Sequence, residues 1–101
     1  LNIFASDIEA VLCDHPAVAE AAVIAIPSDR WGESPYAIVA LREGMAASDD
    51  ELMAWTQARL ARASWPTGIE AVQALPRNDM GKVLKRQLRE PFWRNRGSEI
   101  A

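Results

Sequence analysis

Apolar positions change their spacing several times along the chain, and each change marks a predicted element. Three segments are predicted to be helices: residues 6–15, 48–60 and 82–90. The signals are apolar residues at helical spacing, serines that can cap a helix start, and prolines that follow a helix end. Three almost wholly apolar runs are predicted to be strands: residues 18–26, 36–41 and 69–72. The first two strands are expected to pair antiparallel. The order α-β-β-α-β-α predicts an α+β fold, a small mixed or antiparallel sheet of about three strands flanked by helices.

Helix boundaries are predicted from caps and prolines. Ser6–Glu9 and Ser48–Glu51 both have the form of a capping box, in which the serine hydroxyl accepts from the glutamate amide and the glutamate side chain reaches back. Prolines are expected to end the helices, at Pro16, Pro66 and Pro91. His15 is expected to cap the carboxyl end of the first helix rather than to act as a base. Cys13 is expected to be a small buried apolar residue.

Two connections do not behave as simple turns. Residues 27–35, with the sequence PSDRWGESP, are longer than a usual hairpin link of about two to five residues and carry Trp31 beside Gly32. Residues 77–81, with the sequence RNDMG, form a polar loop whose glycine can take a positive φ, and Lys82 follows at once. A lysine at the tip of a tight loop is a projecting charge that suits insertion into the cleft of another domain.

Length and composition indicate one small globular domain, too small for a typical complete metabolic enzyme: 101 residues, half of them hydrophobic and a quarter charged. The single cysteine excludes a disulfide framework or a multi-cysteine zinc site within the chain, and it fits a reducing compartment. No apolar run approaches the roughly 20 residues that span a bilayer, and no signal-peptide pattern opens the chain. Because the first residue is leucine, the sequence is expected to be a piece of a longer protein. A cytoplasmic location is expected.

Positive charge is concentrated near the carboxyl end. Residues 77–96 hold seven of the eleven Lys and Arg against two acids, so this segment carries +5 and the remainder −8 of the net charge of −3. Four of the cations would share one face of the last predicted helix: Lys82, Lys85, Arg86 and Arg89. They would attract phosphates, contact another domain or simply be solvated. A nucleic-acid partner is not expected, because the segment lacks interleaved aromatic residues that stack on bases.

Three segments resemble, in order and spacing, the C-terminal domain of adenylate-forming enzymes: NIFASDIEAVL, HPAVAEAAVIAIPSDRWGESPYAIVALREG and LPRNDMGKVLKRQLRE. This superfamily includes acyl- and aryl-CoA synthetases, the adenylation domains of peptide synthetases, and luciferases. The resemblance implies an acid–thiol ligase, which forms an acyl-adenylate from a carboxylic acid and ATP and then transfers the acyl group to CoA. Residues 1–93 would be its lid domain and residues 94–101 a frayed tail, with the large N-terminal domain and the hinge outside the sequence.

The same resemblance implies that ATP and CoA are substrates and that Mg²⁺ is bound outside this domain. The implied partners are the N-terminal domain of the same enzyme and a small carboxylic acid, so this chain alone is expected to be inactive. In this superfamily the lid swings between two poses, one for each half-reaction. Different surfaces of the lid therefore serve the two steps.

Lys82 matches the catalytic lysine of the superfamily motif Pro-x-x-x-x-Gly-Lys, which spans Pro76 to Lys82 and includes Gly81. The resemblance implies that its ammonium group contacts the substrate carboxylate and the α-phosphate during adenylation, where negative charge is crowded together. It also implies regulation by a lysine acetyltransferase, because acetylation removes the charge that the step needs. The alternative is a solvated lysine at the start of a helix.

Trp31, Gly32 and Glu33 match a Trp-Gly-Glu segment common in CoA-forming members, and the resemblance implies that they line the path of the pantetheine arm. Substituting leucine for Gly32 would then block thioester formation without lowering the melting temperature. The alternatives are that Trp31 covers the core and that Gly32 supplies a positive φ. Trp65 stands where the superfamily usually has a Tyr-Lys-x-Pro element near the CoA nucleotide, so its indole is a candidate for stacking on adenine.

Two other functions compete with this interpretation. The lid of an enzyme that loads the phosphopantetheine of a carrier protein would have a similar sequence, although the Trp-Gly-Glu segment favours CoA. A freestanding module that binds a nucleotide or a protein without catalysis would use the basic helix. The upstream reading frame separates these classes, because a large domain with a Ser/Thr/Gly-rich phosphate-binding loop excludes the freestanding module.

Overall fold

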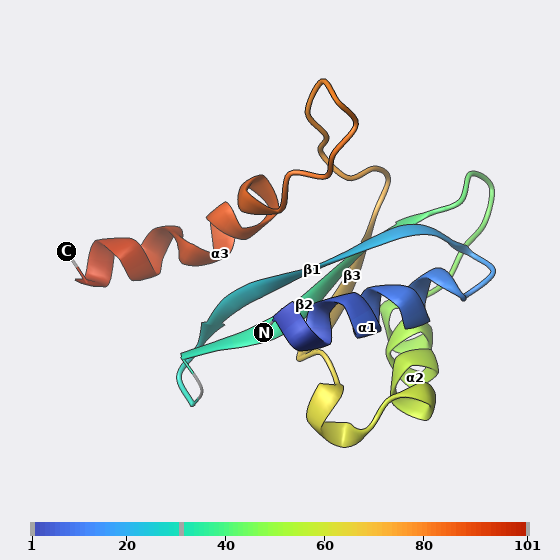
Figure 1. Ribbon diagram of the computed structural model, residues 1–101, viewed down its shortest axis with the longest axis horizontal. Helices are drawn as coiled ribbons and strands as arrows, with labels where there is room; N and C mark the ends of the chain where they lie inside the picture. The colour runs from blue at the N-terminus through green and yellow to red at the C-terminus, as the bar shows by residue number, and fades with distance from the viewer. Residues whose placement is uncertain (1, 31, 101) are drawn as a thin grey trace.

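The fold is a three-stranded sheet with helices on both faces. The computed structural model describes the backbone of residues 2–30 and 32–100 and the side chains of residues 5–30 and 32–94. The elements in chain order are α1 (Asn2–Cys13), β1 (Val18–Ser28), β2 (Gly32–Leu41), α2 (Asp49–Arg59), a 3₁₀ turn (Arg62–Ser64), β3 (Gly68–Val72) and α3 (Lys85–Ile100). Helices α1 and α2 cover one face of the sheet and α3 lies against the other (Figure 1). The predicted fold class and element order are confirmed.

The sheet has the strand order β1-β2-β3 and is mixed. β1 and β2 pair antiparallel with Val23 opposite Ala37, as predicted. β2 and β3 pair in parallel, with Tyr36 opposite Gly68. A parallel pair needs a long crossover connection, and α2 lies within it.

Both faces of the sheet are buried. Successive strand residues point to opposite sides, so each strand contributes side chains to both faces. One face packs against α1 and α2 through a cluster that includes Ile8, Leu12, Val18, Val23, Val39 and Leu52. The other face packs under α3 and the segment before it, through a cluster that includes Ala22, Ile24, Ile38, Ala40 and Leu75. A sheet covered on both faces requires nearly continuous apolar strands, which is the pattern seen in the sequence.

The first predicted capping box does not form. Helix α1 already begins at Asn2, so Ser6 lies inside the helix and is exposed. The Glu9 side chain does not reach back toward Ser6. Its Oε2 accepts a hydrogen bond from the backbone amide of Val23 at 2.8 Å and lies 2.7 Å from Nζ of Lys85. Glu9 therefore joins α1 to β1 and to the start of α3.

The second predicted capping box forms on one side only. Ser48 caps α2 by accepting a hydrogen bond from the amide of Glu51 at 3.0 Å. The Glu51 side chain turns instead to Nε2 of His15, at 2.9 Å. His15 is buried against the edge of Trp55, and its Nδ1 accepts from the amide of Ala17 at 3.0 Å. Both ring nitrogens have structural partners, so His15 bridges two elements rather than capping α1.

The long link between the first two strands is shorter than predicted. β1 continues through Pro27, which lies opposite Glu33, and β2 begins at Gly32. The connection is therefore residues 29–31. A proline is tolerated here because β1 is an edge strand, where a missing N–H can face solvent.

Helix α3 differs from its prediction at both ends. It begins at Lys85 rather than at Lys82, and it continues past Pro91 instead of ending there. Packing after the proline explains the extension, because the ring of Phe92 lies 5.0 Å from that of Tyr36 and Trp93 donates a hydrogen bond to a β1 carbonyl at 2.8 Å. The expected fraying of the tail stays a prediction.

Cys13 is exposed, contrary to the expectation that it would be buried. Helix α1 turns Leu12 toward the sheet, and its neighbour Cys13 consequently faces away. Within the described ranges no helix is both long and apolar enough to cross a membrane.

Candidate functional site

Lys82 lies in a hairpin that projects from the domain between β3 and α3. Residues 76–84 form this element, the Lys82 hairpin, seen as the orange loop in Figure 1. The amide of Leu84 donates to the carbonyl of Pro76 at 2.9 Å, and the two arms meet in an isolated antiparallel bridge. Lys82 is therefore the end of a turn and not the first residue of a helix.

Asn78 and Gly81 define the tip of the hairpin. Oδ1 of Asn78 accepts hydrogen bonds from the amides of Met80, at 2.9 Å, and Lys82, at 3.0 Å. The backbone of Asn78 also donates to the carbonyl of Lys82 and accepts from the amide of Gly81, each at 3.0 Å. Gly81 has a φ of +82°, so the expectation that this glycine takes a positive φ is confirmed.

The base of the hairpin is attached to the body of the domain on both arms. Arg77 forms an ion pair with Glu20 in β1, and its Nη1 donates to the carbonyl of Gly81 at 2.6 Å. On the other arm, just after the hairpin, Lys85 lies 2.7 Å from Glu9 in α1. Side chains on two different elements thus hold the element that carries the candidate lysine.

Part of the positive charge near the carboxyl end is neutralised within the domain. Three cations form ion pairs: Arg77 with Glu20, Lys85 with Glu9, and Arg94 with Glu90. A hydrogen bond from Arg94 lowers the pKa of the Glu90 carboxyl. Among the side chains that the structure describes, Lys82, Arg86 and Arg89 have no ion-pair partner. Lys82 is therefore an exposed and unpaired cation at a projecting tip, where an anion can reach it.

Two further predicted site residues, Gly32 and Glu33, begin β2, and this end of the strand lies away from the Lys82 hairpin (Figure 1). Trp31 lies outside the described residues. Gly32 is exposed with a φ of +82°, which is the conformation expected if it serves the turn. Glu33 is exposed and lines a small hollow of about 150 Å³ together with Lys85 and Arg89.

Trp65 follows the 3₁₀ turn and comes just before a residue that contacts β2. Its Nε1 donates to the carbonyl of Leu60, at 2.9 Å, and the guanidinium carbon of Arg62 lies 5.8 Å from its ring centroid. Two residues later, the amide of Thr67 donates to the carbonyl of Pro35 at 2.8 Å. The structure therefore brings the segment of Trp65 close to the segment of Gly32 and Glu33, and leaves the indole half-buried.

Tyr36 and Gly68 fix the parallel pairing beneath this surface. The hydroxyl of Tyr36 donates to Oε1 of Glu70 at 3.0 Å, and burial together with this carboxylate raises the pKa of Tyr36 to about 12. A Cβ atom on Gly68 would lie 2.5 Å from Cε1 of the Tyr36 ring, so the ring occupies the space that a side chain would need. Tyr36 is a neutral packing residue and offers no acid–base chemistry near pH 7.

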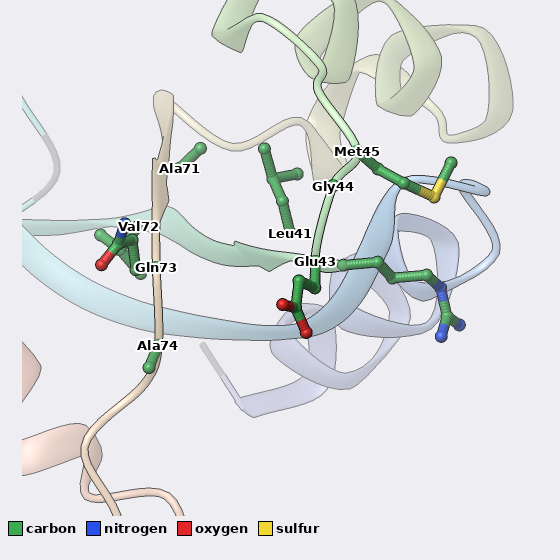
Figure 2. A pocket seen from close by; sticks show the side chains of 9 residues that line it. Leu41, Glu43, Gly44, Met45, Ala71, Val72, Gln73 and Ala74 are labelled. Atoms are coloured by element: carbon green, nitrogen blue, oxygen red, sulfur yellow. The ribbon is translucent and has the colours of Figure 1, made fainter.

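A hollow of about 830 Å³ opens at the ends of β2 and β3, between residues 41–45 and residues 71–74. In Figure 2 the Glu43 and Met45 side chains stand on one side of it and Gln73 and Ala74 on the other. None of the predicted site residues lines it. It holds no pair of groups that suggests catalysis.

Sequence reasoning missed the residues that hold the Lys82 hairpin. Asn78 carried a usable signal, because an asparagine in a polar loop commonly bonds backbone amides two residues on. The pairs that attach the hairpin, Arg77 with Glu20 and Lys85 with Glu9, join residues far apart in the sequence. Such pairs leave no local pattern.

The family model for the AMP-binding enzyme C-terminal domain matches residues 7–82. A fatty acid–[acyl-carrier-protein] ligase, ScoC of Streptomyces coeruleorubidus, is 40% identical over 92 residues, which is 91% of this chain and 18% of that protein. The 2-succinylbenzoate–CoA ligase of Geobacillus kaustophilus is 40% identical over 88 residues, 87% of this chain and 18% of that protein. The mitochondrial malonate–CoA ligase ACSF3 of Bos taurus is 40% identical over 87 residues, 86% of this chain and 15% of that protein.

Solved structures agree with the sequence matches. ATP-bound MatB from Rhodopseudomonas palustris superposes with a TM-score of 0.80 at 33% identity, covering 86% of this chain and 17% of that one. A fatty acyl-CoA synthetase of Mycobacterium tuberculosis gives a TM-score of 0.79 at 37% identity, covering 89% and 18%. The chain thus spans less than a fifth of the length of these relatives.

Proposed function

Because the chain belongs to the AMP-binding enzyme C-terminal domain family, we propose that it is the C-terminal domain of an ATP-dependent acid–CoA ligase. In the first step a carboxylate oxygen attacks the α-phosphate of ATP, which forms an acyl-adenylate and releases pyrophosphate. In the second step the CoA thiol attacks the acyl carbon and releases AMP. The observation that carries the proposal is an unpaired lysine, Lys82, on a projecting hairpin that two ion pairs attach to the domain.

Lys82 would act in the first step. Its ammonium group would donate hydrogen bonds to the attacking carboxylate and to an α-phosphate oxygen, where negative charge builds up as the new bond forms. A compact charge on a long stem suits this task, and charge stabilisation in a dry site is commonly the largest catalytic contribution. An ion-pair partner within the domain would compete for the same ammonium group, and the described side chains offer none.

The β1–β2 turn and Trp65 would act in the second step. Gly32 and Glu33 at this turn, and the neighbouring segment of Trp65, would face the pantetheine arm and the nucleotide of CoA. The Lys82 hairpin and the start of β2 lie apart in Figure 1, as two alternately presented surfaces require. One pose would present the lysine to the active site and the other would present the turn.

A carrier-protein phosphopantetheine is the second candidate for the thiol. The similarity to ScoC, a fatty acid–[acyl-carrier-protein] ligase, favours this candidate. ScoC and the 2-succinylbenzoate–CoA ligase are each 40% identical to this chain, so identity alone does not separate the two thiols.

The described residues hold no cluster of three or more His, Cys, Asp or Glu side chains suited to a metal ion. We propose that Mg²⁺ is bound outside this domain, by the N-terminal domain. We also propose a cytoplasmic location and acetylation of the exposed Lys82 by a lysine acetyltransferase.

The full-length protein that contains this domain tests the proposal. It is incubated with ATP and one acid at a time: malonate, 2-succinylbenzoate, aryl acids or fatty acids. Hydroxylamine is added as the acceptor of the acyl group, and pyrophosphate release is measured. Release that depends on one class of acid is expected, followed by thioester formation when CoA replaces hydroxylamine. No release with any acid would contradict the proposal and favour the freestanding binding module. Thioester formation on a carrier protein but not on CoA would select the second candidate, and this 101-residue chain alone should release no pyrophosphate.

A further inference from the structure

Asn78 holds the backbone of Lys82 through two hydrogen bonds. Its Oδ1 accepts from the Lys82 amide at 3.0 Å, and its own amide donates to the Lys82 carbonyl at 3.0 Å. The same Oδ1 holds the amide of Met80 at 2.9 Å. Both backbone polar groups of Lys82 thus end on Asn78, which fixes the direction in which the lysine side chain leaves the hairpin.

The position of Asn78 is itself determined by its neighbour. Arg77 joins the hairpin to β1 through Glu20 and closes the tip by donating to the carbonyl of Gly81. A continuous series of contacts therefore runs from the sheet through Arg77 and Asn78 to Lys82. The hairpin is exposed, so these contacts bury little apolar surface. Their main effect is on geometry, and their effect on the overall stability is small.

We propose that Asn78 is a positioning residue for adenylation, which places the Lys82 ammonium group against the reacting carboxylate and α-phosphate. This inference rests on the proposed function. A lysine stem has several rotatable bonds, so only a fixed Cα position and direction make its reach reproducible. A displacement of about 1 Å from the productive geometry can reduce a rate by about 100-fold. Asn78 has no predicted contact with substrate, and it acts through Lys82.

The test compares two variants of Asn78 in the full-length protein. Asn78→Ala removes both side-chain hydrogen bonds, whereas Asn78→Ser keeps an uncharged side-chain oxygen that can accept from a nearby backbone amide. Adenylation is followed by pyrophosphate release with hydroxylamine, and the second step by CoA attack on supplied acyl-adenylate. We expect Asn78→Ala to lower kcat for adenylation about tenfold or more, with KM for ATP within about twofold and the CoA step unchanged. Asn78→Ser should keep adenylation within about threefold of wild type.

Ser48→Ala is the matched control. Like Asn78→Ala, it removes a side-chain oxygen that accepts a hydrogen bond from a backbone amide, here at 3.0 Å. The lost bond lies at the start of α2, away from Lys82. It should lower the melting temperature and leave the ratio of the two half-reactions unchanged. If Asn78→Ala behaves like Ser48→Ala, with no selective loss of adenylation, the positioning role is refuted. A loss of adenylation in Asn78→Ser as large as that in Asn78→Ala also counts against it.

Hydrogen exchange gives a readout that does not depend on activity. In the full-length protein, Asn78→Ala should accelerate exchange of the amides of Met80 and Lys82 by about tenfold, whereas Ser48→Ala should not change it. Unchanged exchange in Asn78→Ala would overturn the inference. If wild-type protein releases no pyrophosphate with any acid, the proposed function fails, and this exchange measurement still decides whether Asn78 holds the hairpin.

Discussion

Gly32 allows a conformational role and a CoA-binding role to be separated. Its φ is +82°, and a Cβ atom built on it has no neighbour within 4 Å beyond the adjacent residues. The Cβ atom itself thus meets no obstruction, so we expect the loss of stability to come from the backbone conformation. Leucine disfavours this left-handed conformation by about 1–2 kcal/mol. Asparagine adopts it more readily than most residues and is the matched substitution.

We expect Gly32→Leu to lower the free energy of unfolding by about 1–2 kcal/mol, and Gly32→Asn to lower it by less than about half as much. For a domain of this size, each kcal/mol corresponds to about 4–8 °C in Tm. Urea and thermal unfolding of the 101-residue chain, followed by circular dichroism, measure both values. The expectation from sequence that Gly32→Leu leaves the melting temperature unchanged is therefore revised. Two variants as stable as wild type would refute the reasoning from φ.

The half-reactions of the full-length protein then test the CoA path. Gly32→Asn adds a polar side chain at little cost in backbone energy. If this turn lines the path of the pantetheine arm, the variant should form acyl-adenylate at the wild-type rate and transfer the acyl group to CoA more slowly. If both steps keep their wild-type rates, Gly32 serves only the turn, and the proposed role of this surface in the second step is wrong.

Two further predictions concern the packing under this surface. Gly68→Ala should lower the free energy of unfolding by about 1–3 kcal/mol in urea, because its Cβ would lie 2.5 Å from Cε1 of Tyr36. An unchanged urea midpoint would mean that the ring moves aside freely. Tyr36 is the single tyrosine, so ultraviolet absorbance of the phenolate reports it alone, and it should ionise near pH 12 when folded rather than near its ordinary value of 10.0. The folded state favours the neutral phenol. The contribution of Tyr36 to the free energy of unfolding is therefore complete below pH 10.0 and is lost as pH rises toward 12. Tyr36→Phe should remove this part of the pH dependence of stability. A folded-state midpoint at the ordinary value would contradict the raised pKa.

The order and type of the elements could be predicted from sequence because they depend on local patterns. Apolar strands flanked by polar links gave β1, β2 and β3, and Ser48 gave the start of α2. The boundaries were less predictable where tertiary contacts decide them. Phe92 and Trp93 pack on the sheet and carry α3 past Pro91, and no local rule anticipates that.

The candidate site divides in the same way. Lys82 and Gly81 could be identified from a short motif, and the positive φ of Gly81 followed from its place in a polar loop. The residues that hold the hairpin could not be identified, because Glu20 and Glu9 are distant in the sequence from the cations that they bind. The local pattern predicts a capping box for Glu9 instead. A carboxylate has many possible partners, and only the packing of α1 on β1 selects one.

The central claim is that Lys82 acts in adenylation alone, and the most direct measurement compares the two half-reactions in Lys82→Ala and Arg86→Ala variants of the full-length protein. Arg86 is an exposed cation nearby with no assigned role, so it controls for a general loss of positive charge. We predict that Lys82→Ala slows acyl-adenylate formation by about 100- to 1,000-fold and leaves CoA attack on supplied acyl-adenylate near the wild-type rate. Arg86→Ala should keep both rates. Equal loss of both half-reactions in Lys82→Ala, or no loss of either, would contradict the account.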